Sequence, residues 1–296
     1  MRGMTSNILL ISVLALAVVA GCKKNSTEPV SDTNATEDAA ASIASSFSDD
    51  GGGVADQMGD ATDLASSGGI QAEINANIFY SRHGGASVDT SYDAVTKTWT
   101  ITINRSRTSL TGVYSAGIYR KYSCQFLNKS GQPQKYFVVP KPGSGPDTAY
   151  TILFKILQGN GYRIARYLTQ RLDSLSGDWT ITGTNTPTVT INGSYYKRGA
   201  DTLTTRNAVR TLNHELTLAF TNCTAARGNR STISQTMSGT VSGTYNATIS
   251  VTRGEVYNER SISRTFTVTF SGGTGTININ GNTFTMNMRY GELTSL

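Results

Sequence analysis

Few residues of this 296-residue chain could perform chemistry. Its only histidines are His83 and His214, and the chain contains no G-x-S-x-G, H-E-x-x-H, paired C-x-x-C or phosphate-binding loop. His214 alternates with Leu212, Leu216 and Leu218, which is the pattern of a strand with one buried face, so a structural histidine is favoured over a base or a ligand. We therefore expect no catalytic residue, no metal site and no cofactor.

Paired carboxylates are the one catalytic device that the composition leaves open. A glycosidase needs two acids at a fixed separation across a cleft. Nothing in the sequence selects any two of the candidates, which are Asp173, Asp178, Asp201, Glu215, Glu255 and Glu259. A polysaccharide hydrolase that uses two of these carboxylates is therefore the alternative hypothesis, and a non-enzymatic binding or scaffold protein is the leading one.

Two cysteines in the body of the chain, Cys124 and Cys223, leave a second question open. In an oxidising compartment they could form a disulfide, and closing a loop of about 100 residues would contribute up to about 4.7 kcal/mol. The alternative is a pair of buried free thiols, because spacing alone does not show whether two cysteines meet.

The first 22 residues have the pattern of a secretory signal. Arg2 precedes an apolar run from Ile8 to Ala20, which is shorter than the roughly 20 apolar residues that a membrane span requires. The run ends in Val-Ala-Gly-Cys at residues 19–22, which resembles the bacterial lipobox. This resemblance implies cleavage after Gly21 and attachment of diacylglyceryl and a further acyl chain such as palmitate to Cys22.

The residues after Cys22 bear on location. Lys23 and Lys24 stand where inner-membrane lipoproteins typically carry Asp. The resemblance therefore implies a lipoprotein in the outer membrane of a Gram-negative bacterium, and whether it faces the periplasm or the exterior stays open. Its expected partners are the membrane, through Cys22, and an envelope protein, a lipid or a glycan. Nucleic acid is not expected as a partner of an exported chain.

Composition divides the chain into four parts. We predict a signal peptide at 1–21, a polar tether at 22–37, an acidic Ala-rich helical leader at 38–73 and an antiparallel β domain at 74–296. Residues 23–73 hold 2 Lys against 10 Asp and Glu, a charge of −8, whereas residues 74–296 hold 23 Lys and Arg against 10 Asp and Glu, a charge of +13. In the leader, apolar residues at helical spacing predict two short helices interrupted at 49–53.

The β domain is predicted from alternation with a period of two, which is clearest in Ser231–Arg253. About ten to twelve such segments joined by short turns favour an all-β fold, a large curved antiparallel meander sheet or incomplete barrel. Gly239 and Gly243 are expected at a bend or bulge. The leader helices should cover an inner face built around Trp99, Trp179, Tyr245, Phe266 and Phe270.

The opposite face of these strands is polar. It carries Thr, Ser, Asn and Arg, whereas a membrane-spanning barrel would need an apolar outer surface, so we expect Cys22 and not the sheet to hold the protein at the membrane. The segment 265–289 and the Arg-Gly-Asn-Arg turn at 227–230 are similar in composition to uncharacterised β-rich lipoproteins of Gram-negative bacteria. This similarity supports the class and transfers no functional residue.

Overall fold

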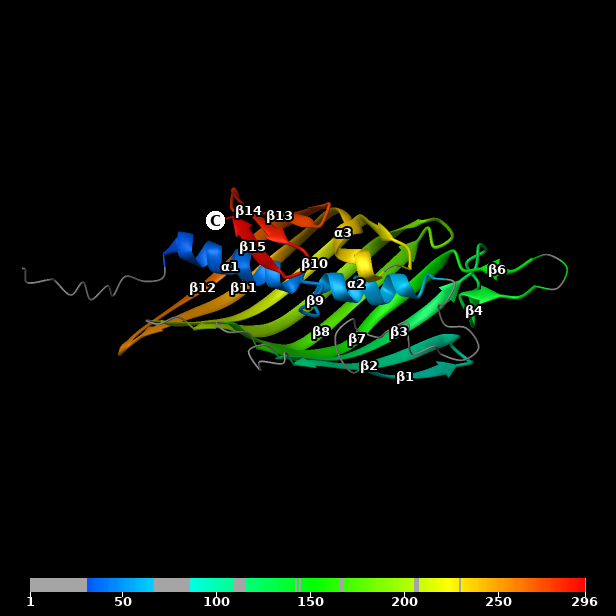
Figure 1. The fold of residues 1–296 in the computed structure, drawn as a ribbon, viewed down its shortest axis with the longest axis horizontal. Helices are drawn as coiled ribbons and strands as arrows, with labels where there is room; N and C mark the ends of the chain where they lie inside the picture. The colour runs from blue at the N-terminus through cyan, green and yellow to red at the C-terminus, as the bar shows by residue number, and fades with distance from the viewer. Residues whose placement is uncertain are drawn as a thin grey trace, which may run out of the picture.

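The computed structural model describes residues 31–66, 86–108, 115–141, 143, 145–164, 168–204, 208–228 and 230–295. Within these residues a 13-stranded sheet curves around two N-terminal helices, as Figure 1 shows. No helix in the described ranges is both long enough and apolar enough to cross a membrane.

The two predicted leader helices are confirmed as α1 (Asp32–Ser46) and α2 (Val54–Asp63). Ser31 caps α1, because its side-chain oxygen accepts a hydrogen bond from the Asn34 backbone N–H at 3.2 Å. The chain turns between the helices at Gly52, whose φ of 74° suits glycine. α1 begins inside the segment that the sequence assigned to the tether at 22–37, so the boundary is corrected to Ser31.

The strands follow the chain almost in order. Their bounds are β1 (Ala86–Asp93), β2 (Thr98–Thr108), β3 (Ser115–Leu127), β4 (Pro133–Gln134), β5 (Val138–Val139), β6 (Asp147–Thr148), β7 (Thr151–Ile164), β8 (Leu168–Thr182), β9 (Thr188–Thr204), β10 (Val209–Ala226), β11 (Ser238–Arg253), β12 (Val256–Ser271), β13 (Thr274–Ile279), β14 (Asn282–Asn287) and β15 (Glu292–Ser295). The short β5 and β6 form a separate pair, and β4 pairs with β3.

The main sheet is an antiparallel meander. Its order is β1-β2-β3-β7-β8-β9-β10-β11-β12-β13-β14-β15, and the two ends do not pair, so the sheet is open. This confirms the predicted curved meander. Asn280 and Gly281 form the turn between β13 and β14, and both have positive φ (51° and 78°), which Asn-Gly pairs accept readily in hairpin turns.

The segment Ser231–Arg253 is only partly a strand. Its first residues form a short 3₁₀ turn, η2 (Arg230–Thr232), and one helical turn, α3 (Ile233–Thr236), before β11 begins. Ile233 and Met237 are both buried, and a spacing of four residues satisfies a helix as well as alternation does. The predicted strand is therefore wrong over this first part.

A bulge lies next to the start of β11, close to where the glycines predicted one. The pairing of β10 with β11 shifts between Thr221 and Thr224, opposite Gly239, whose φ is 113°. Gly243 has regular pairing instead. A Cβ at Gly243 would lie 2.6 Å from the Phe266 ring, so this glycine provides room for the ring.

The core lies between the concave face of the sheet and the two helices. All five predicted inner-face aromatic residues are buried. At the end of α1, Phe47 is fully buried and its ring packs against Phe270 with centroids 5.3 Å apart. Every residue of α2 is buried as well. The helices therefore fill the curve of the sheet, which is the arrangement visible in Figure 1.

Removing the Phe47 ring tests this packing. We expect Phe47→Ala to lower the free energy of unfolding by about 3–5 kcal/mol, because it leaves a cavity between α1 and β12. Urea denaturation measures the loss. Val95→Ala, at a side chain that is 91 % exposed, is the control and should change little. A Phe47→Ala protein as stable as the wild type would mean that α1 does not pack on the sheet.

Candidate functional site

A buried cluster of opposite charges fastens α2 to the rest of the protein. Asp56 and Asp60 lie one turn apart on α2, and each is bound by both Arg105 of β2 and Arg230 of η2. Arg105 Nη1 lies 3.0 Å from Asp56 Oδ2. The Tyr122 hydroxyl donates to Asp60 Oδ2 at 2.9 Å. We call these five residues the arginine–aspartate cluster.

The acids in and around the cluster have pKa values that are shifted in opposite directions. Burial acts to raise the pKa of Asp60, but Arg105 and Arg230 outweigh it and hold the pKa below its usual range. Burial raises the pKa of Asp63 to about 7, and burial with the nearby Asp56 raises the pKa of Asp49 to about 6. Two arginines thus stabilise two carboxylates, and two further acids nearby hold protons up to near neutral pH.

A second buried group surrounds Asp201 of β9, beneath α1. Ser42 Oγ of α1 donates to Asp201 Oδ2 at 2.5 Å, Gln170 Nε2 of β8 donates to Oδ1 at 3.1 Å, and His214 Nε2 of β10 lies 3.3 Å from Oδ2. Burial would raise the pKa of Asp201, but the contacts with His214, Lys197 and Ser42 lower it to about 2. Asp201 stands between Ser42 and His214, so the histidine is not placed to activate the serine as a nucleophile.

Further ion pairs fix α1 along its length. At its first turn Asp32 Oδ1 accepts from Arg260 and Arg264 of β12, each at 2.5 Å. In its middle Asp38 Oδ1 accepts from Arg210 Nη1 at 2.9 Å. These arginines lie on the concave face of the sheet, so α1 is held by charges as well as by apolar contacts.

A cavity of about 400 Å³ lies between α1, the adjoining ends of β8–β10, and β15. We call it the α1 cavity. Apolar and polar side chains both line it. The lining residues are Glu37, Asp38, Ala41, Ser42, Ser45, Leu168, Gln170, Asp201, Leu203, Arg210, Leu212, Gly291, Glu292 and Leu293. Its volume is at the lower end of the range for small-molecule sites.

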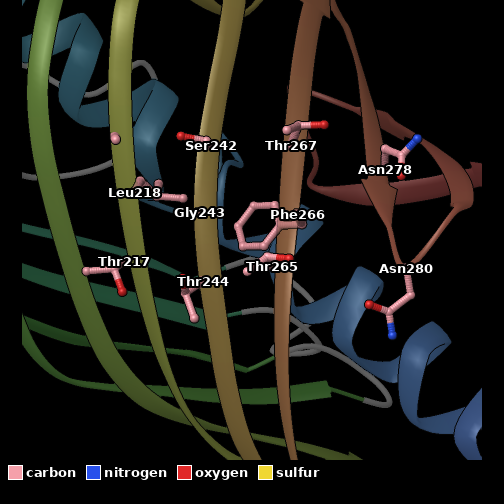
Figure 2. A pocket seen from close by; sticks show the side chains of 11 residues that line it. Thr217, Leu218, Ser242, Gly243, Thr244, Thr265, Phe266, Thr267, Asn278 and Asn280 are labelled. Carbon is pink, nitrogen blue, oxygen red and sulfur yellow. The ribbon is translucent and has the colours of Figure 1, made fainter.

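A second hollow, of about 610 Å³, lies on the convex side of β10–β13. Figure 2 shows its side chains with the helices behind the strands. Thr217, Thr244 and Thr265 form one row across β10, β11 and β12, and Asn278 and Asn280 stand at its edge. None of its eleven lining residues is charged. This threonine trough offers hydroxyl and amide groups to an uncharged polar ligand.

The structure corrects the disulfide alternative. Cys124 of β3 and Cys223 of β10 are free, buried thiols. Strands β7, β8 and β9 lie between them in the sheet, which separates them by roughly 19 Å along its curve. A disulfide needs Cα atoms within about 7 Å, so these two cysteines do not pair. Burial raises the pKa of both thiols, that of Cys223 to about 11.

The other predicted residues lie far apart. Cys22 and His83 are outside the described residues. His214 is buried, as expected of a structural histidine. Of the six candidate acids, Asp201 lines the α1 cavity. Three of the others have surface partners, with Asp173 bound by Arg171, Asp178 by Lys155, and Glu259 by the Tyr257 hydroxyl.

Sequence reasoning missed the arginine–aspartate cluster, although a signal was present. Arg105 and Arg120 occupy inner-face positions in strands that are otherwise apolar at alternate residues. Arg120 is also buried, and its Nη2 donates to the Gly52 carbonyl at 2.9 Å. An arginine among the apolar residues on the buried face of a strand indicates that a carboxylate or carbonyl packs against it. In this protein the acidic leader supplies these groups.

Comparison with protein-family models, with curated proteins and with solved structures found no match in any of the three.

Asp60→Asn tests the arginine–aspartate cluster. We expect a loss of about 3–5 kcal/mol in the free energy of unfolding, because Arg105 and Arg230 would stay buried with less compensating charge. Urea denaturation measures it. The matched control is Asp178→Asn, which breaks an ion pair whose side chains are 53 % and 57 % exposed and should cost less than about 1 kcal/mol. Equal losses for the two variants would contradict the role of the cluster.

Asp63→Asn tests the raised pKa. Folded Asp63 keeps its proton up to about pH 7, whereas the unfolded carboxyl loses it near pH 4. Between these values the folded state binds more protons, so the contribution of Asp63 to stability falls as pH rises.

The measurement is the free energy of unfolding at several pH values from 4 to 8. Stability should fall less with pH in Asp63→Asn than in the wild type, while Asp178→Asn follows the wild type. Identical pH slopes for Asp63→Asn and the wild type would show that Asp63 titrates normally in the folded protein.

Proposed function

We propose that this chain is a lipid-anchored envelope protein without enzymatic activity, whose β domain binds a small, partly apolar ligand in the α1 cavity. The observation that carries the proposal is the lining of this cavity. Leu168, Leu203, Leu212 and Leu293 supply apolar walls, and buried polar groups of α1 and β9 lie beside them. Apolar walls with a few placed polar groups are the usual composition of a small-molecule site.

The position of the cavity supports the link to the anchor. α1 begins at the end of the sheet where Asp32 meets β12, and the cavity is lined from the same end of the strands, by Leu168 and Leu203. The nine Cα–Cα steps from Cys22 to Ser31 can span at most about 32 Å. An acylated Cys22 would therefore keep this end of the domain near the membrane, where amphiphilic ligands concentrate. Lys23 and Lys24 favour the outer membrane.

The hydrolase alternative has one observation in its favour. Asp38 and Asp201 both line the α1 cavity, and their pKa values move in opposite directions. Burial raises the pKa of Asp38, and the partners of Asp201 lower its pKa to about 2. Acid and base pairs in glycosidases show such a division. Against it, Asp201 is already bound by Ser42, Gln170 and His214, which leaves little of it for a substrate or water.

Native mass spectrometry of protein purified from its own membranes tests the proposal. We expect the acyl mass on a chain that begins at Cys22, and a co-purified small molecule. Leu203→Trp should fill part of the cavity and reduce the occupancy of that molecule at least tenfold.

Thr217→Trp is the matched variant, because it places the same ring in the threonine trough. Loss of the ligand in Thr217→Trp but not in Leu203→Trp would move the site to the convex face. A mature chain that carries no acyl group would contradict the proposed lipid anchor. A ligand that still co-purifies with Leu203→Trp would contradict the proposed binding in the α1 cavity. A cleaved glycan in place of an intact ligand would favour the hydrolase.

A further inference from the structure

A small cavity lies under the chain that joins α1 to α2, and basic residues surround it. Its volume is about 40 Å³, and the three glycines at 51–53 form one wall. Arg120 of β3, Arg163 of β7 and Lys197 of β9 line it from the sheet, and none of the fifteen described residues that line it is acidic. We call it the linker cavity. Its lining carries positive charge and no carboxylate.

The three basic side chains come from different strands and converge on the linker. Arg120 Nη2 donates to a carbonyl of the linker at 2.9 Å, and Lys197 Nζ donates to Ser46 Oγ at 2.9 Å. A Cβ at Gly51 would lie 3.0 Å from Arg163 Nη1, so the glycine lets this guanidinium approach the backbone closely. The fold therefore gathers like charges at one buried place.

Arg120 and Lys197 are held by neutral partners. Arg120 is 2 % exposed, and its hydrogen bonds end on carbonyl oxygens, two in the sheet and one in the linker. In the described part of the chain no carboxylate forms an ion pair with either residue. Burial lowers the pKa of Lys197, Asp201 opposes this, and Arg120 and Arg163 lower it further. Buried charge without full compensation is unfavourable, so a bound anion would stabilise this arrangement.

The acids closest to the cavity are already engaged. Asp50 comes directly before the glycines and binds Arg289 at 3.2 Å, and Asp201 accepts hydrogen bonds from α1 and β8. Helix α2 begins at Val54 beside the cavity, and the positive end of its dipole adds to the field of the basic side chains. The surroundings therefore favour an anion as the ligand.

The size of the cavity limits the anion. A water molecule needs about 10–15 Å³ of such space, so about 40 Å³ has room for about three atoms of that size. A chloride ion or a single carboxylate group fits this space, whereas a tetrahedral phosphate group exceeds it.

We propose that the linker cavity binds a small anion, of the size of chloride or of a single carboxylate group, between Lys197 and Arg120. The anion would compensate the buried charges and hold the linker, and with it the start of α2, against β3, β7 and β9. The site lies beside the α1 cavity, and Ser45 and Gln170 line both. It does not depend on the ligand proposed for the α1 cavity.

The stability of the full-length protein measures binding, because a ligand that binds only the folded state raises the folding equilibrium constant. Chloride, formate and phosphate are each raised from about 1 to about 100 mM in urea denaturation, with a bulky sulfonate buffer keeping the ionic strength constant. We expect chloride or formate to raise the folding equilibrium constant about tenfold, as for a dissociation constant of about 10 mM, and phosphate to have little effect. A larger effect of formate identifies a carboxylate, and a larger effect of chloride identifies a halide.

Two variants locate the effect. Lys197→Met should abolish the response to the small anion, because it removes a charge from the cavity and keeps the length of the side chain. Lys155→Met, at a side chain that is 53 % exposed, is the matched control and should respond as the wild type does. A response that survives in Lys197→Met, or an equally large response to phosphate, would place the anion elsewhere. A wild-type protein that responds to neither small anion would overturn the inference.

Bromide diffraction keeps the test valid if Lys197→Met does not fold. In crystals of the wild-type protein soaked in bromide, an anomalous peak should lie between Lys197 and Arg120. Peaks on the surface alone would indicate an adventitious ion only, and would show that the linker cavity is a packing void. Either result leaves the co-purified ligand of the α1 cavity untested, so the two proposals can fail separately.

Discussion

Two arginines, Arg105, which is buried, and Arg230, which is largely buried, hold the structure together at the point where a polar helix enters an apolar core. Arg105 comes from the second strand and Arg230 from the turn before β11, and each binds both Asp56 and Asp60. Removing such charges from water is costly, and the mutual attraction of a buried pair offsets that cost only when the hydrogen bonding is nearly complete. Here each carboxylate has both arginines, and Asp60 has Tyr122 in addition.

This arrangement gives specificity as well as attraction. The apolar residues of α2 are small apart from Val54 and Met58. Their burial alone would therefore not fix the position of the helix along the sheet. A shift of one turn would move one aspartate into the place of the other and take the second away from both arginines, so one carboxylate would lose its partners and the arginines would keep only half of the compensating charge. The cluster therefore selects one position for α2. The chain between the helices, with Arg120 bound to Gly52, then directs α1 along the remaining concave face, and the α1 cavity is the space that α1 leaves beside β8–β10.

Local pattern predicted most of the elements, because alternation and helical spacing are properties of neighbouring residues. The strands, both leader helices and the buried aromatic residues were predicted from these local patterns. The predicted strand was wrong at Ile233 and Met237, because a spacing of four residues fits both a helix and an alternating strand. The predicted tether was wrong after Ser31, because this residue caps α1 within a polar stretch. Long-range partners were not predictable. The distance from Cys124 to Cys223 depends on three intervening strands, and the pairing of an acidic leader with arginines of the sheet depends on register across the whole fold.

Hydrogen exchange measured by mass spectrometry tests the central claim most directly, since it reports the stability of the helices and the sheet in one experiment. If buried charges fasten the helices to the sheet, peptides from Asp32–Ser46 and Val54–Asp63 should exchange as slowly as those from β9 and β10 at neutral pH. Fast exchange in both helices, with slow exchange in the strands, would show that the sheet is stable without them. The arginine–aspartate cluster would then not be the contact on which the fold depends.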